Sequence, residues 1–202
     1  YKATGIAPSD IRTVIESSNS DLTITADVLS QLFWVNSYMQ HYGIDAAAAL
    51  VLSGTFISQT AHGSQPSTFT HLFNSPPLSG QVFAADDTVI KLKPSDINDS
   101  FRSGVLKRAF RVNDTELYTL WSLATGTATP PDFTCNINNL SKLYRVSLLA
   151  EVHGLSVAEL AALLSVSPYV TQAIESLSET ELARLVSFVD QYTQWLAQMN
   201  WT

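Results

Sequence analysis

The sequence has few charged side chains, and basic ones are the scarcer kind. Of its 202 residues, 14% are charged, and 11 Lys and Arg against 18 Asp and Glu leave a net charge of −7. About 25% is usual for a soluble globular protein. With no basic stripe to neutralise phosphates, we expect neither nucleic-acid binding nor adhesion to anionic lipid. The low charge suits a domain with neighbours on several sides, and equally an ordinary soluble domain.

Cysteine and long apolar runs are also scarce. Cys135 is the only cysteine, so no internal disulfide forms and a zinc site lacks its partners. The longest apolar run is 46–52, whereas crossing a bilayer takes roughly 20 residues. We therefore expect no direct membrane insertion by this segment.

Short motifs that carry catalysis are missing too. The sequence has no HExxH, no phosphate-binding glycine loop and no G-x-S-x-G turn. His41 and His153 lie near the ends of expected helices, where we expect them to cap. His62 and His71 lie in or beside a linker, where we expect them to be solvated. These patterns predict an assembly segment and disfavour an enzyme.

Two remaining candidates for chemistry have simpler interpretations. Asp86 and Asp87 form the only compact acidic pair in a loop, which we expect to face solvent. Cys135 has no neighbouring histidine in sequence, and we expect a small buried thiol. We therefore predict no catalytic residue, no metal ligand and no cofactor.

Helical patterns dominate what is present. Apolar residues recur every three or four positions, as on one face of a helix. The expected helices cover 9–15, 25–42, 45–52, 70–73, 96–110, 114–123, 136–153, 156–164 and 169–176. A long C-terminal helix is expected within 178–199, with its helical pattern over 179–199. The fold class is therefore all-α, a multi-helical array of short paired helices over a single unit, 1–202.

Three helix starts carry the capping-box pattern. In each, the first side chain accepts from a free backbone N–H and a glutamate three residues later reaches back. The pairs are Asn113 with Glu116, Ser156 with Glu159, and Ser178 with Glu181.

One long irregular connection, 55–95, interrupts the helices. It is rich in Gly, Ser, Thr and Pro, which break regular structure. Residues 88–93 alternate as a minor β segment would, but no partner strand is evident, so we favour an extended loop. Because long connections are often functional, a binding module acting through 53–93 stays open as an alternative.

The chain matches itself after a shift of 111 positions. Leu29–Phe33 lies over Leu140–Tyr144, and Gly43 lies over Gly154. We predict two copies of a glycine-hinged helix pair, 8–54 and 113–165, with Leu29 and Leu140 in their core stripes. Neither unit can bury both faces alone, so neighbours would stack on it. The alternative is that any two amphipathic helices joined by a glycine look alike.

Aromatic residues fall at helical positions, and we expect most of them in the core. Two are expected to face a neighbouring segment, Trp34 and Trp201, since each lies off the main stripe or at the chain end. The set is Phe33, Trp34, Trp121, Tyr144, Trp195 and Trp201. Because the chain begins at Tyr1 and ends directly after a helical pattern, we expect an excerpt of a longer protein.

Three stretches resemble one protein family. They are 70–81 (THLFNSPPLSGQ), 106–110 followed by 114–117 (LKRAF, DTEL), and 140–145 followed by 148–150 (LSKLYR, LLA). In this order and spacing they are similar to the A components of insecticidal toxin complexes, the Tc toxins. The resemblance covers about 70–164.

The resemblance implies a role in an assembly. Such A components are large homopentamers secreted by bacteria, in which a helical shell surrounds a channel that enters the host membrane. The implied partners are other segments of the same chain, neighbouring protomers, and, through the full-length protein, the B and C components and a host receptor. The family's known catalysis belongs to the delivered enzyme, and no pore residue transfers to this chain.

Overall fold

The computed structural model describes residues 6, 8, 11–12, 14–15, 23–61, 66–167 and 174–199, and every structural statement here concerns these residues. Helices dominate, and the predicted all-α class is confirmed. In chain order the elements are α2 (Ala26–Tyr42), α3 (Ala46–Leu52), α4 (Thr68–Asn74), β1 (Val89–Ile90), α5 (Ser100–Phe110), α6 (Asp114–Thr125), β2 (Phe133–Thr134), α7 (Ile137–Val152), α8 (Val157–Ser165), the 3₁₀ turn η1 (Ile174–Ser176) and α9 (Glu179–Gln198).

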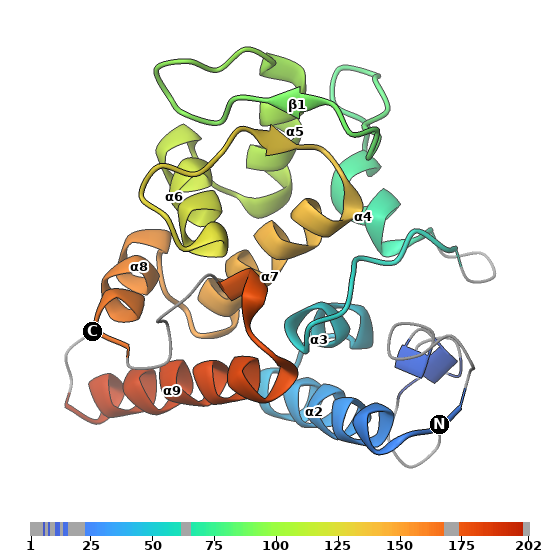
Figure 1. Ribbon diagram of the computed structural model, residues 1–202, viewed down its shortest axis with the longest axis vertical. Coiled ribbons are helices and arrows are strands. Elements are labelled where there is room, and N and C mark those ends of the chain that lie inside the picture. The colour runs from blue at the N-terminus through green and yellow to red at the C-terminus, as the bar shows by residue number, and fades with distance from the viewer. Residues whose placement is uncertain are drawn as a thin grey trace.

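The helices lie in layers along the longest axis of the molecule. Helices α2 and α9 form one end, α3, α7 and α8 lie in the middle, and α4, α5, α6 and the small sheet form the other end (Figure 1). Buried apolar side chains from every layer join in one hydrophobic core. Helix α7 contributes six buried apolar residues to this core, and the shorter α3 contributes five.

Local signals place the helix boundaries. All three predicted capping boxes are present, at Asn113, Ser156 and Ser178. Helix α5 begins at Ser100 and not at the predicted Asp96, because the Asp99 side chain caps it by accepting from the backbone N–H of Arg102. Of the expected helix at 9–15, residues 11, 12, 14 and 15 are helical, and 169–173 of the helix expected at 169–176 lie outside the described residues.

The alternating segment forms a strand, so our preference for an extended loop was wrong. Val89 and Ile90 pair antiparallel with Thr134 and Phe133. The Cys135 N–H donates to the Thr88 carbonyl and extends the contact. A partner strand of two residues leaves no periodicity in the sequence, which is why it was not evident.

The backbones of the two predicted copies agree closely. The N-caps Thr25 and Asn136 begin α2 and α7, and Gly43 and Gly154 follow those helices with φ of 66° and 65°. Tyr42 and His153, which are 111 residues apart, contact each other. The division of the chain into units 8–54 and 113–165 stays a prediction.

The surroundings of the two copies differ. Leu140 is fully buried, whereas Leu29 is 58% exposed and Phe33 is 64% exposed. The prediction that Leu29 lies in the core was therefore wrong within this chain. Its backbone position matches that of Leu140, but among the described residues no element covers it as α7 is covered.

Alanine at either hinge glycine should destabilise the fold. At Gly43 and Gly154 a Cβ would meet nothing within 4 Å, so only the positive φ matters. We expect Gly43→Ala and Gly154→Ala each to lower the unfolding free energy by about 1 kcal/mol, since the left-handed region disfavours a side chain. Urea unfolding followed by circular dichroism measures this. Gly154→Asn is the matched control and should recover part of the loss, since Asn tolerates this conformation; equal losses for Ala and Asn would contradict the explanation.

Candidate functional site

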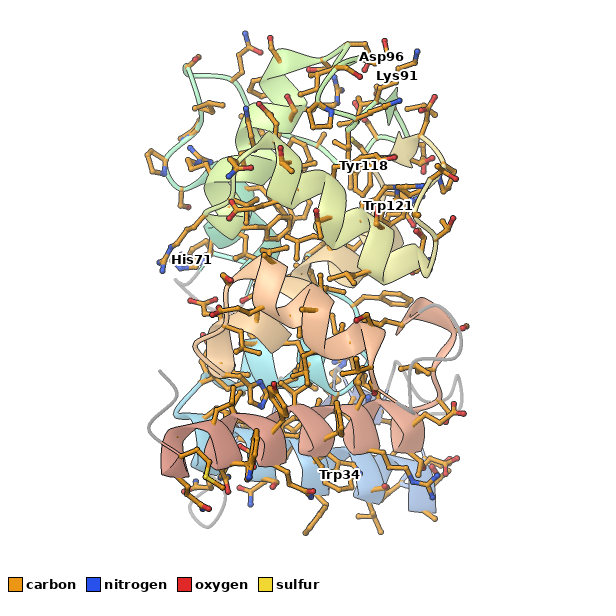
Figure 2. All side chains as sticks on the ribbon, turned by 90° about the vertical axis from the view of Figure 1, so that its left-hand side faces the viewer. Trp34, His71, Lys91, Asp96, Tyr118 and Trp121 are labelled. Atoms are coloured by element: carbon orange, nitrogen blue, oxygen red, sulfur yellow. The ribbon has the colours of Figure 1, made fainter. Side chains whose placement is uncertain are left out.

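The three described histidines, His41, His71 and His153, lie in different surroundings. His41 Nε2 lies 3.0 Å from Asp190 Oδ1 on the surface between α2 and α9. This pair was missed in the sequence because its members are 149 residues apart. His41 therefore pairs with a carboxylate across two helices. The predicted capping role is not seen for it. His71 is exposed, as expected (Figure 2), and His62 lies outside the described residues.

His153 is the C-cap residue of α7, as predicted, and both its ring nitrogens are engaged. Nδ1 lies 2.8 Å from the Leu149 carbonyl, which only accepts, so Nδ1 carries the hydrogen of the neutral ring. Nε2 then accepts from the Tyr42 hydroxyl at 3.1 Å. Burial lowers the pKa of His153 and raises the pKa of Tyr42. The pair fastens the ends of α2 and α7 together.

The acidic pair and the cysteine are also accounted for. Asp86 is exposed but bound: it pairs with Arg102, and hydrogen bonds from Thr88 lower the pKa of its carboxyl further. Asp87 is exposed, as expected. Cys135 is a buried thiol, as predicted, and burial raises its pKa to about 12. In the part of the chain that the structure describes, no group of three or more His, Cys, Asp and Glu is placed to hold a metal ion.

Two hollows on the surface are lined by mixtures of polar and apolar side chains. One of about 380 Å³ is lined by His71, Glu116 and Glu151, among others. Glu116 already accepts from the backbone N–H of Asn113 in its capping box, and Glu151 pairs loosely with Arg111. A groove of about 340 Å³ between α2 and α9 is lined by Trp34, Arg184 and Phe188. Within the described ranges, no single helix is long and apolar enough to cross a membrane; α7 and α8 pass that test only together, with a 96° bend between them.

Two of the buried polar residues, Arg145 and Ser141, hold α7 against α3 and against the segment that follows α3. Arg145 of α7 donates from Nε to the Val51 carbonyl at 2.8 Å and from a terminal nitrogen to the Thr55 carbonyl at 3.0 Å. One turn earlier, Ser141 Oγ accepts from the Ile57 N–H at 2.9 Å. These bonds satisfy the backbone groups left open where α3 ends. They also hold the start of the long connection against α7.

Burial of Arg145 has an electrostatic consequence. Desolvation lowers the pKa of its guanidinium to about 10, so it stays cationic at neutral pH. Its hydrogen bonds in the described part of the chain go to carbonyls and not to a carboxylate: one is that of Val51 in the last turn of α3, where the helix dipole favours positive charge, and the other is that of Thr55 in the segment that follows. The site is therefore a charge-assisted cap supplied by a different helix.

A second fastening holds the 70–81 stretch. The Asn74 side chain bonds both backbone groups of Phe83, accepting from its N–H at 2.7 Å and donating to its carbonyl at 3.0 Å. Arg108 of α5 donates to the carbonyls of Phe73 and Pro76. Between them the chain turns sharply, with Leu78 and Gln81 bridged. The long connection is thus anchored by side chains in its described parts, 53–61 and 66–93.

Packed aromatic rings lie between the Arg145 contacts at the end of α3 and the Arg108 contacts after α4. Phe73 packs edge-on against Phe110 with ring centroids 6.0 Å apart, and Phe110 stacks on Tyr144 at 6.2 Å. Phe69 and Phe83 complete the cluster on the far side. Of the three stretches that carry the family resemblance, the middle one, 106–110 with 114–117, therefore contacts both 70–81 and 140–150. Their recurring residue types serve packing.

Some of the other predictions for aromatic residues are confirmed and others are wrong. Trp121 is buried, as expected, and its indole N–H donates to the Pro131 carbonyl at 2.8 Å. Phe33 and Trp195 are exposed, so the expectation that they lie in the core was wrong. Trp34 lies at the end of the molecule formed by α2 and α9 (Figure 2) and lines their groove, as its position off the stripe predicted. Trp201 lies outside the described residues.

The fold and its buried polar groups define a helical packing module, in which side chains of one helix close the ends of another. Comparison with solved structures gives its relatives. TcdA4 of Morganella morganii is 35% identical in sequence, covers 87% of the chain and superposes with a TM-score of 0.78. The chain belongs to the family of Tc toxin A components.

A second solved structure agrees in fold. TcaA–TcaB of Yersinia pseudotuberculosis covers 98% of the chain with a TM-score of 0.72 at 14% identity, a likeness that shows the fold alone. The chain spans 8% of TcdA4 and 10% of the TcaA–TcaB chain. No protein-family model matches it, and no curated protein does.

Removing the Arg145 cap should destabilise the chain. Arg145→Met keeps a long apolar side chain but takes the buried donor away from the Thr55 carbonyl and leaves the Val51 carbonyl with the Gly54 N–H alone, so we expect a loss of about 2–4 kcal/mol in unfolding free energy. Denaturant unfolding measures it. Arg111→Met is the matched control, because Arg111 is exposed and its pairing with Glu151 is long, so its loss should stay within about 0.5 kcal/mol. A loss of similar size in both variants would contradict the capping role.

Stability should fall below neutral pH through His153. Because burial lowers its pKa below the ordinary 6.5, the unfolded chain binds more protons between the two pKa values, and stability rises with pH there. The contribution is complete above pH 6.5 and is lost as the pH falls toward the folded pKa. We expect His153→Gln to flatten the decrease in melting temperature between about pH 7 and pH 5. His71→Gln, at an exposed position, should leave it in place; an unchanged slope in His153→Gln would contradict the assignment.

Proposed function

We propose that this chain is a structural and interaction segment of the helical shell of a Tc toxin A subunit. In that role it supports host-cell attachment and toxin translocation by the full assembly, which is secreted and acts outside the bacterium. It contributes no catalysis, and its partners are other segments of the same polypeptide and neighbouring protomers, with the B and C components and a host receptor reached through the full-length protein.

The observation that carries the proposal is that the middle one of the three family stretches contacts both of the others. Arg108 holds the turn after Phe73, and Tyr144 stacks on Phe110, so residues shared with the family serve to lock helices together. A shell needs this property, since its helices have to keep their positions while other parts move. The sequence likeness to TcdA4 supports the same conclusion.

A receptor- or subunit-binding role for 53–93 is the alternative. Its described residues carry three exposed large apolar side chains, Phe56, Val82 and Val89. Against it, Arg145, Ser141 and Asn74 each bond the backbone of this connection, which favours a packing role over a free binding loop.

Electron microscopy of the longer polypeptide that contains this segment tests the proposal. The expected result is a ring-shaped oligomer in which density for these helices lies in the outer wall. A monomer, or placement of the segment outside the wall, would sink it. Binding of the isolated chain to host cells, abolished by Val82→Asp and not by the distant exposed change Gln40→Asp, would instead establish the alternative.

A further inference from the structure

Three large apolar side chains lie exposed together around the start of α2. Ile24 is 66% exposed, and Leu29 and Phe33, one turn apart on the helix, are 58% and 64% exposed. We call these residues the α2 face. Single exposed apolar residues are ordinary, but a cluster along one helix marks a surface that another element covers.

The second copy of the helix pair shows what happens to the same positions when they are covered. Helices α2 and α7 begin at equivalent residues and are followed by equivalent left-handed glycines. The counterparts of the α2 face, 111 positions later, are Cys135, Leu140 and Tyr144. Cys135 and Leu140 are fully buried, and Tyr144 is partly buried. The backbone positions agree, so the difference is the presence of a covering segment.

That covering segment precedes α7 in the chain and runs from the end of α3 to the end of α5. Ile57 donates its N–H to Ser141. Thr88 and Asp87 bond the backbone of Cys135 on both sides. Phe110 stacks on Tyr144. Each contact therefore comes from residues 57–110, which lie N-terminal to the helix that they cover.

We propose that the α2 face is covered in the same way by the stretch of polypeptide that precedes residue 1, folded like 57–110. This rests on the proposed function, under which the chain is part of a longer protein. The length outside it is ample, since the chain spans 8% of TcdA4. A shift of 111 residues places the covering segment within about 55 residues before Tyr1, and the counterpart of Phe110 directly before Tyr1.

The side chains on and beside the α2 face indicate what kind of segment covers it. Ser30 occupies the position of Ser141, where a hydroxyl receives a backbone N–H from an extended segment. Phe33 occupies the position of Tyr144, where a ring receives a second aromatic ring. The occupant therefore carries an extended strand-like stretch followed by a helix that ends in a large aromatic or apolar residue.

Cysteine labelling tests the proposal. Leu29→Cys places a thiol on the exposed α2 face, and Gln40→Cys places one on the same helix at the position equivalent to Glu151, which stays exposed in the second copy. Cys135 is buried and gives little background. In the 202-residue chain both thiols should react quickly with a maleimide. In the longer polypeptide Leu29→Cys should react roughly tenfold or more slowly, while Gln40→Cys keeps its rate.

A photoreactive benzoyl-phenylalanine at position 33 of the longer polypeptide identifies the occupant. The expected cross-link joins this position to a peptide just before Tyr1. Equal labelling rates of Leu29→Cys in both proteins, or a cross-link to a distant segment, would overturn the proposal. Protection that rises with the concentration of the 202-residue chain would instead assign the face to a second copy. If the longer polypeptide forms the toxin ring and Leu29→Cys stays reactive, this inference fails while the proposed function stands; if no ring forms, the proposed function fails.

Discussion

One buried cation determines how the two helix pairs are joined. Helix α3 ends with carbonyls that have no partner within the helix, and the chain then leaves as an extended segment. Arg145 of α7 reaches both the last turn and the departing segment. Burying a guanidinium is unfavourable, and the hydrogen bonds from Nε and from one terminal nitrogen to backbone carbonyls offset part of that cost. These bonds therefore position the first residues of the long connection against α7.

The same principle recurs at smaller scale. Arg108 holds the turn after α4, the Asn74 amide holds the backbone of Phe83, and His153 holds Tyr42. In each case a polar side chain satisfies groups that a neighbouring element left open. The aromatic rings between these fastenings supply apolar contact. Among the described groups that looked like candidates for chemistry, His153 and Cys135 are part of this packing, Asp86 pairs with Arg102, His41 pairs with Asp190 at the surface, and His71 and Asp87 are exposed.

The two predicted copies of the helix pair share their local features and differ in burial. The helix starts and the glycines agree, whereas the exposure of equivalent side chains depends on the neighbouring segments. Equivalent N-caps start α2 and α7 at the same position of the predicted repeat, and α7 ends one residue earlier than α2 relative to the equivalent left-handed glycine. Yet Leu29 faces solvent where Leu140 is buried, because only α7 has the preceding 57–110 segment against it. An assembly built from such units needs a neighbour for each unit, which agrees with the small share of its relatives that this chain spans.

Much of the fold was predictable from sequence, and the site less so. Helix starts at Asn113, Ser156 and Ser178 and the stops at Gly43 and Gly154 depend on contacts within a few residues, so the local sequence alone determined them. Only the tertiary structure decided the Val89 strand, the His41–Asp190 pair, the Arg145 cap and the exposure of Leu29. Each of these features depends on segments that lie far apart in the chain and meet only in the folded protein. The free energy of such a contact depends on both partners. Neither stretch of sequence therefore predicts the contact by itself.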